Sequence, residues 1–148
     1  MTNIKVLIII SKYYEDISEN LFKSTVTFLE ENLILFDVIE VPGALEIPQV
    51  LNFQVNTSNN IRFAYQGYIA LGCVIKGETY HFEIVSNETN RGLMSVALKH
   101  SFPLGNGVIT AYNYDQALKR SLDKGKEAAQ ACCELIKIKN YNNKVDKN

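Results

Sequence analysis

The chain has 148 residues, of which 47% are hydrophobic and 21% charged, and its net charge is −1. These values suit one globular domain with a full core. The absence of a basic stripe argues against nucleic-acid binding, and the longest apolar runs are too short to span a membrane. With no signal-peptide pattern at its start, we expect a single domain over residues 1–148 that works in the cytoplasm.

Apolar segments alternate with helical patterns from the first residues onward. Residues 4–11 form a continuous β-branched run, which is typical of a strand buried on both faces. Asp16 and Glu19 have the spacing of a capping box, so we expect a helix to begin there. Residues 35–41 predict a second strand, and residues 44–53 predict a short helix after a Pro-Gly turn.

The same alternation continues through the middle of the chain. The polar residues 56–60 predict a loop. Residues 68–75 form an apolar run that predicts a third strand, and residues 82–99 have the spacing of a third helix. We expect a turn over residues 102–107, followed by a short fourth strand over residues 108–111.

The last helical pattern covers residues 114–137, with an expected weak point at residues 123–125. Residues 139–148 are rich in lysine and asparagine, and we expect a frayed tail. Strands that alternate with helices predict an α/β fold: a three-layer α/β/α sandwich around a four-stranded parallel sheet, of the flavodoxin-like kind.

Ligands of such folds bind outside the carboxyl ends of the strands. Four segments follow predicted strands and should share this edge: residues 12–14, 42–46, 76–81 and 110–113. In the third of these segments, a glycine turn with Thr79 leads into a helix start, where free N–H groups favour an anion. His81 comes two residues later, and histidine can exchange protons near neutral pH. The motif is short, and His81 could equally be a helix-start residue that bonds a backbone carbonyl.

Each of the other candidates at this edge has two interpretations. Tyr13 could stack on a planar ring or could be solvated. Glu46 could hold a ligand or could stabilise the start of a helix. Arg120 and Lys124 could clamp a phosphate or could form a solvated helix face. Cys73 lies inside an apolar strand, so we expect a buried small hydrophobe rather than a nucleophile.

Taken together, these residues resemble the lumazine synthase family. The matching segments are residues 41–48 (VPGALEIP), 70–88 (ALGCVIKGETYHFEIVSNE), 107–110 (GVIT) and 113–117, with Arg120, Lys124 and Gly125. The resemblance implies a transferase that condenses 5-amino-6-(D-ribitylamino)uracil with 3,4-dihydroxy-2-butanone 4-phosphate. The product is 6,7-dimethyl-8-ribityllumazine, the penultimate compound of riboflavin biosynthesis, and phosphate and water are released. The resemblance implies neither a metal nor an organic cofactor.

The resemblance also implies a role for each site residue. His81 matches the family's proton donor. Residues that match the pyrimidine- and ribityl-binding positions are Tyr13, Ala44, Leu45, Glu46, Cys73, Val74, Ile75 and Asn106, the last of them from a neighbouring subunit. Residues that match the phosphate site are Glu78, Thr79 and Arg120, with Lys124 in a supporting electrostatic role. Leu45 stands where many members carry an aromatic residue, so stacking should depend more on Tyr13, and Asn106 replaces what is often a bulky apolar residue.

Family members form five-fold rings with active sites between adjacent subunits, and some build an icosahedral capsid from twelve rings. The short segment between Arg120 and Lys124 and the short N-terminal arm favour a pentamer or a pair of pentamers here. Riboflavin synthase is a candidate partner.

Two other functions predict different residues. A non-catalytic ring that binds flavin or lumazine should lack Thr79, His81 or Arg120, yet all three are present. A flavodoxin-like FMN protein of another family should have a hydroxyl-rich loop after the first strand, which residues 12–15 do not offer.

Overall fold

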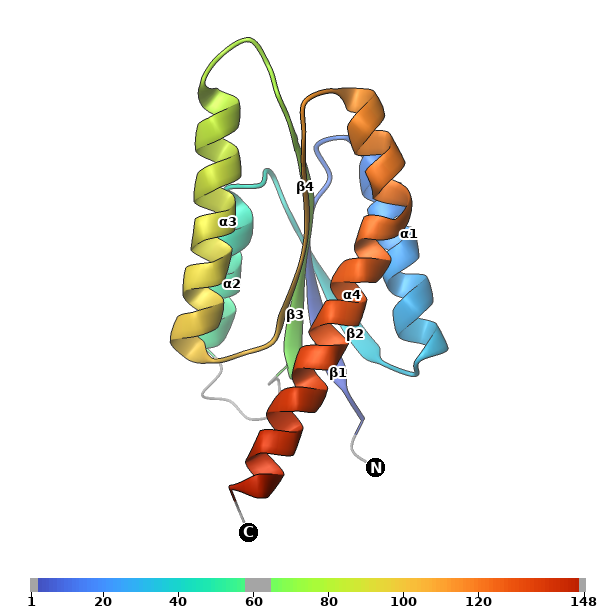
Figure 1. Cartoon of the computed structure of the whole chain (residues 1–148), viewed down its shortest axis with the longest axis vertical. Coiled ribbons are helices and arrows are strands. Elements are labelled where there is room, and N and C mark those ends of the chain that lie inside the picture. Colours follow the sequence, from blue (N-terminus) through green and yellow to red (C-terminus); the bar gives the residue numbers. More distant parts are fainter. Residues whose placement is uncertain (1–2, 58–64, 147–148) are drawn as a thin grey trace.

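The computed structural model describes residues 3–57 and 65–146. Within them, strands and helices alternate in the order β1 (Lys5–Ser11), α1 (Glu15–Glu31), β2 (Leu35–Val41), α2 (Glu46–Thr57), β3 (Gly67–Ile75), α3 (His81–His100), β4 (Leu104–Ala111) and α4 (Tyr114–Val145). The strands form one parallel sheet in the order β2-β1-β3-β4. Helices α1 and α4 cover one face and α2 and α3 the other (Figure 1). The predicted α/β/α sandwich is confirmed.

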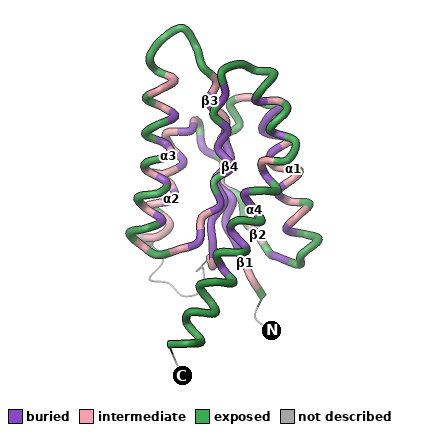
Figure 2. The backbone as a smooth tube through the Cα atoms, viewed as in Figure 1, coloured by how far each residue is buried: buried purple, intermediate pink, exposed green. Residues whose placement is uncertain are grey.

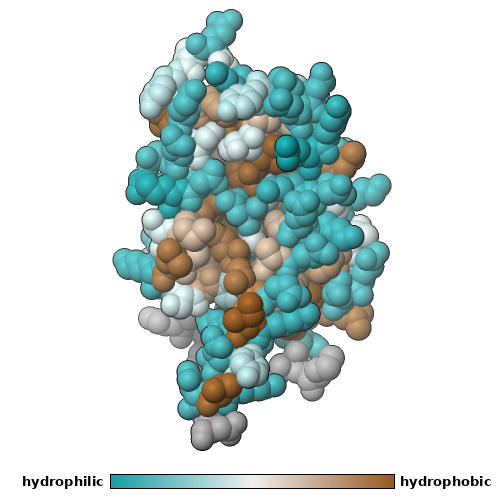
Figure 3. All heavy atoms as spheres, viewed as in Figure 1, coloured by the Kyte–Doolittle hydropathy of each residue, from teal (hydrophilic) through white to brown (hydrophobic). Residues whose placement is uncertain are grey.

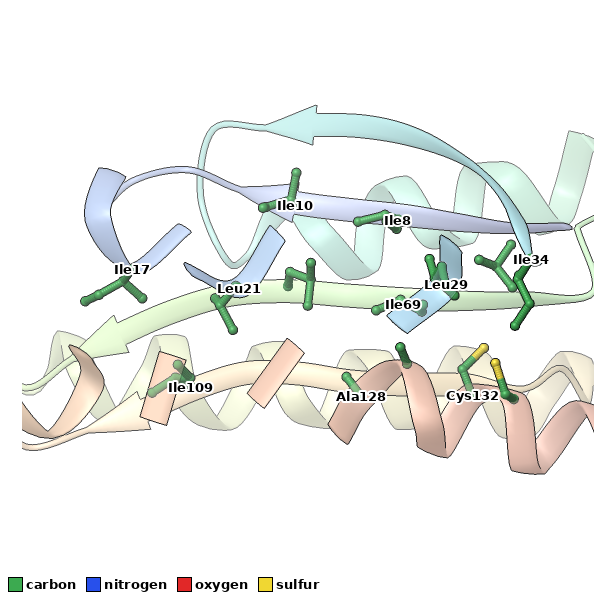
Figure 4. Close-up of a cluster of buried hydrophobic side chains, with 14 of the residues drawn as sticks. Ile8, Ile10, Ile17, Leu21, Leu29, Ile34, Ile69, Ile109, Ala128 and Cys132 are labelled. Atoms are coloured by element: carbon green, nitrogen blue, oxygen red, sulfur yellow. The ribbon is translucent and has the colours of Figure 1, made fainter. Parts of the chain in front are cut away.

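Strand β1 is buried on both faces, and its side chains alternate between two cores. Val6, Ile8 and Ile10 pack under α1 and α4, where Figure 4 shows Ile8 beside Leu29 of α1. Leu7 and Ile9 point to the opposite core, against α2 and α3. The burial view shows this central strand buried along its length (Figure 2). A strand enclosed in this way reads as the continuous apolar run seen in the sequence.

Two predicted helix starts differ from the structure. Helix α1 begins at Glu15 after the N-cap residue Tyr14, and no side chain caps it, so the capping-box interpretation of Asp16 is wrong. Helix α2 begins at Glu46 rather than at residue 44 and runs to Thr57. The first two residues of the predicted 56–60 loop therefore belong to α2, and its last three lie outside the described residues.

The predicted turn over residues 102–107 is also wrong, because β4 already begins at Leu104. Gly105 lies beneath α4, and a Cβ atom there would come 1.9 Å from the carbonyl oxygen of Ala128. Glycine is thus present to let the helix approach the strand, whereas in the sequence it suggested a turn.

Helix α4 begins at Tyr114 as predicted, and the Asn113 side chain caps it by accepting a hydrogen bond from the Gln116 N–H at 2.9 Å. The helix is not interrupted near Gly125, and it continues to Val145 rather than ending at residue 137. Its last turns extend beyond the sheet (Figure 1). No helix in the described part of the chain is long and apolar enough to cross a membrane.

Candidate active site

A pocket of about 350 Å³ opens at the carboxyl ends of β1, β2 and β3. It is lined by Tyr13, Tyr14, Gly43, Ala44, Leu45, Glu46, Cys73, Val74, Ile75, Gly77, Thr79, His81, Phe82 and Val85. Three of the four segments expected to meet at this edge therefore do meet there. Because each segment follows a different strand, the parallel sheet alone brings them together.

The predicted site residues divide into two groups. Those that line the pocket are Tyr13, Ala44, Leu45, Glu46, Cys73, Val74, Ile75, Thr79 and His81. Those that do not line it are Glu78, Asn106, Arg120 and Lys124. The first group carries the predicted ring-binding and proton-transfer residues. From the predicted phosphate site, only Thr79 lies in this pocket.

The loop after β1 presents one tyrosine to solvent and anchors the other. Tyr14 packs against the core beside α1, and its carbonyl accepts a 2.7 Å hydrogen bond from the buried Ser18 hydroxyl. The ring of Tyr13 stands edge-on to that of Tyr14, with 5.0 Å between the centroids. Tyr13 is 73% exposed, so a broad aromatic face is free at the pocket rim for stacking on a planar ligand.

Glu46 is half-buried at the first residue of α2, and its carboxylate lines the pocket. Its backbone N–H donates to the Gly43 carbonyl at 3.2 Å, which closes the turn after β2. Within residues 3–57 and 65–146, no hydrogen bond or ion pair engages the carboxylate itself. Its oxygens can therefore accept hydrogen bonds from a hydroxyl-bearing ligand.

His81 is the first residue of α3 and is exposed at the pocket. Its backbone N–H donates to the Thr79 hydroxyl at 3.4 Å, and no side chain caps the helix at Tyr80. The helix thus directs the positive end of its dipole toward the rim occupied by Thr79. The imidazole therefore lies next to the helix start at which the sequence predicts an anion site.

Cys73 lies near the end of β3, where burial raises the pKa of its thiol to about 12. The thiol therefore stays protonated at neutral pH, and a protonated thiol is a poor nucleophile. The half-buried position in the strand agrees with the predicted structural role rather than a nucleophilic one.

A second hollow, of about 390 Å³, runs along β4 and the start of α4, and Arg120 and Lys124 line it together with Thr110 and Tyr112. In the described part of the chain, neither cation makes an ion pair. Asn106 lies nearer the start of β4. Its side-chain amide donates to Asn90 Oδ1 at 2.8 Å and accepts from the Val108 N–H at 3.0 Å.

Five residues of the pocket wall were not named as site residues: Tyr14, Gly43 and Gly77, which lie within the predicted edge segments, and Phe82 and Val85, which lie outside them. Phe82 and Val85 follow His81 along one side of a helix, so their spacing could have indicated them. The position of the Tyr14 ring depends on how α1 packs, which no local pattern reveals. Among the described residues, no three His, Cys, Asp or Glu side chains lie close enough to hold a metal ion.

Comparisons with known proteins agree on one family. Residues 3–140 match the model of the family described as 6,7-dimethyl-8-ribityllumazine synthase. The chain is 43% identical over 143 residues to the protein of that name from Agrobacterium fabrum, covering 94% of this chain and 97% of that protein. It is 41% identical to the protein of that name from Afipia carboxidovorans, covering 94% of this chain and 88% of the relative. The protein of that name from Beijerinckia indica is 45% identical over 140 residues, which are 92% of this chain and 76% of the relative.

Proposed function

The chain belongs to the 6,7-dimethyl-8-ribityllumazine synthase family, and on this premise we propose how the pocket at the sheet edge makes the lumazine. The enzyme condenses 5-amino-6-(D-ribitylamino)uracil with 3,4-dihydroxy-2-butanone 4-phosphate in riboflavin biosynthesis. The observation that carries the proposal is the pocket itself, where Tyr13, Glu46, Thr79 and His81 meet from three different loops. The matched residues, 3–140, support a single domain over the whole chain.

The pyrimidine occupies the part of the pocket that combines an aromatic ring with apolar walls. Tyr13 stacks on the ring, since Leu45 supplies only an aliphatic contact from the opposite segment. The strand end formed by Cys73, Val74 and Ile75 meets the edge of the ring. Glu46 accepts hydrogen bonds from the ribityl hydroxyls, because its carboxylate has no partner within the described chain.

The second substrate places its phosphate at the start of α3. The positive end of the helix dipole favours phosphate oxygens there, and the Thr79 hydroxyl, whose oxygen accepts from the His81 N–H, can donate its own proton to the phosphate. The 5-amino group of the pyrimidine attacks the ketone and loses water to form an imine. Elimination of phosphate then leaves an enol that tautomerises to a second carbonyl. The ribitylamino nitrogen attacks this carbonyl, and loss of a second water closes the ring. Each step moves a proton, and His81 stands beside the phosphate position to carry it. Holding both substrates in reacting geometry supplies much of the remaining rate gain.

Arg120, Lys124 and Asn106 complete the site from a neighbouring copy of the chain. This assignment is supported by their position in one chain, since Arg120 and Lys124 line the hollow along β4 and not the pocket of His81. A guanidinium binds phosphate in bidentate fashion, so an arginine delivered across an interface would close the phosphate site. We propose a pentameric ring, alone or as a pair, in the cytoplasm, with riboflavin synthase as a candidate partner.

The family match does not favour the alternative of a non-catalytic ring that binds lumazine, and product formation separates the two functions. We expect wild-type protein to form the lumazine from both substrates. The absorbance of the lumazine measures the rate. His81→Ala should lower kcat by about 10²-fold, the lower range for losing a general acid or base. His100→Gln is the matched control: His100 ends the same helix far from the pocket, and its kcat should stay at the wild-type level.

Equal rates for His81→Ala and wild type would support the enzymatic activity but would show that His81 does not carry out the proton transfer. No product from folded wild-type protein, with lumazine still bound, would establish the non-catalytic function instead.

A further inference from the structure

Gly43 and Glu46 lie close together in the wall of the pocket. A Cβ atom built on Gly43 would lie 3.0 Å from Glu46 Oε1. The carboxylate thus folds back over the Cα atom of Gly43 and fills the space that a side chain there would need. Both residues line the pocket.

The backbone does not explain why a glycine stands at this position. Among the described residues, no glycine has a positive φ angle, so position 43 does not need the conformational freedom of glycine. A hydrogen bond from the Glu46 N–H to the Gly43 carbonyl closes the turn. The backbone carbonyl of any other residue at position 43 could accept the same bond. What glycine supplies here is space for the carboxylate.

We propose that Gly43 is a positioning residue that fixes where the Glu46 carboxylate stands, and thereby sets the affinity for the polyhydroxylated pyrimidine substrate. This inference rests on the proposed function, in which Glu46 receives the ribityl hydroxyls. The steric contact involves only the far end of a flexible side chain. A methyl group at position 43 therefore shifts the carboxylate by a few tenths of an ångström and leaves the fold in place.

The test is a double-mutant cycle with Gly43→Ala, Glu46→Ala and the double variant, assayed for the KM of each substrate. Gly43→Ala should raise the KM of the pyrimidine about three- to tenfold and leave that of the butanone phosphate unchanged; a tenfold change corresponds to ~1.4 kcal/mol. In the Glu46→Ala background, the same substitution should have no further effect, because no carboxylate remains to be displaced. The urea midpoint of Gly43→Ala should match that of wild type.

Additive effects in the cycle would overturn the inference, since Gly43 would then act through the backbone and not through Glu46. An unchanged pyrimidine KM in Gly43→Ala would overturn it as well. These failures are distinct from failure of the proposed function, in which wild-type protein itself would form no lumazine.

Discussion

Asp37 on the edge strand β2 is held by two neighbours at the end of the sheet opposite the pocket. The Tyr65 hydroxyl donates to its carboxylate at 2.6 Å, and the Lys5 ammonium lies 3.0 Å away. These two hydrogen bonds, that of Tyr65 first, lower the pKa of Asp37. Burial and then the hydrogen bond to Asp37 raise the pKa of Tyr65 to about 12. The contact joins β2 to the segment just before β3.

We predict that Tyr65→Phe lowers the free energy of unfolding at pH 7 by about 0.5 kcal/mol. This loss is smaller than that for a buried hydrogen bond, because the Asp37 side chain is half exposed and water screens the interaction. For Asp37, a lowered pKa contributes stability above its ordinary value of 3.8, and this is lost as the pH falls through the lowered pKa. For Tyr65, a raised pKa contributes stability below its ordinary value of 10.0, and this is lost as the pH rises toward about 12.

Urea unfolding of wild type and Tyr65→Phe across the pH range checks this prediction. The difference between them should be largest between about pH 5 and 9 and shrink on both sides. Tyr141→Phe is the control, because Tyr141 is exposed on α4 and its substitution should have a small, pH-independent effect. A constant difference from pH 3 to pH 12 for Tyr65→Phe would contradict the assignment.

At the scale of elements, the crossing of α1 and α4 depends on one glycine. A Cβ atom on Gly125 would lie 2.2 Å from the Leu21 carbonyl oxygen, 2.4 Å from Thr25 Oγ1 and 2.5 Å from Ser24 Oγ. The backbones of the two helices therefore touch at this point. The helix stays continuous there because tertiary packing outweighs the weak helix propensity of glycine.

We predict that Gly125→Ala lowers the free energy of unfolding by about 2 kcal/mol, since the added methyl group must push α1 away from α4. Gly77→Ala is the matched control, because a Cβ atom there meets nothing within 4 Å, and its stability should stay within about 0.5 kcal/mol of wild type. Urea unfolding measures both. Equal stability of the two variants would show that α1 can move without cost.

At the scale of the whole molecule, large apolar side chains are exposed on two helices. On α3 these include Ile84, Met94 and Leu98, and on α4 Leu135 and Ile138. Figure 3 shows apolar side chains gathered between α3 and the lower part of α4. Apolar side chains gathered on one face favour a contact with another chain, and such a contact is what the proposed ring requires.

We predict that light scattering finds an assembly of five or ten times the chain mass of 16.7 kDa. A heterologous contact that closes on itself gives a ring of this kind. A monomer would contradict the shared site, and a megadalton shell would contradict the choice of a ring over a capsid. Wild-type protein at several concentrations is sufficient for this measurement.

The same ring predicts complementation between inactive chains. Arg120→Ala and His81→Ala should each lose most activity alone. Rings that mix equal amounts of the two variants should recover activity at about a quarter of their interfaces. At these interfaces, an intact Arg120 of one chain meets an intact His81 of the adjacent chain. Activity no greater than that of the two variants kept in separate rings would place both residues in one chain's site.

Much of the fold and part of the site followed from local pattern. The β-branched run of β1 predicts a strand buried on both faces, and the parallel order then brings the loops after β1, β2 and β3 to one edge. Tyr13, Glu46, Thr79 and His81 could therefore be placed together from the sequence alone, because each lies within six residues of the end of a strand. Residue type determines which chemical groups these side chains carry, and the order of the parallel strands determines that their loops are neighbours.

Tertiary structure decided what depends on contacts between distant segments. Gly105 and Gly125 suggested a turn and a weak point, but they are close-packing positions whose neighbours lie on other elements. The contact between Gly43 and the Glu46 carboxylate also follows from three-dimensional geometry and not from spacing. The sequence by itself determined the order of elements and the chemical groups at the edge, since these depend on local periodicity. Only packing decided where helices touch and how a carboxylate is aimed, because such distances depend on the whole chain.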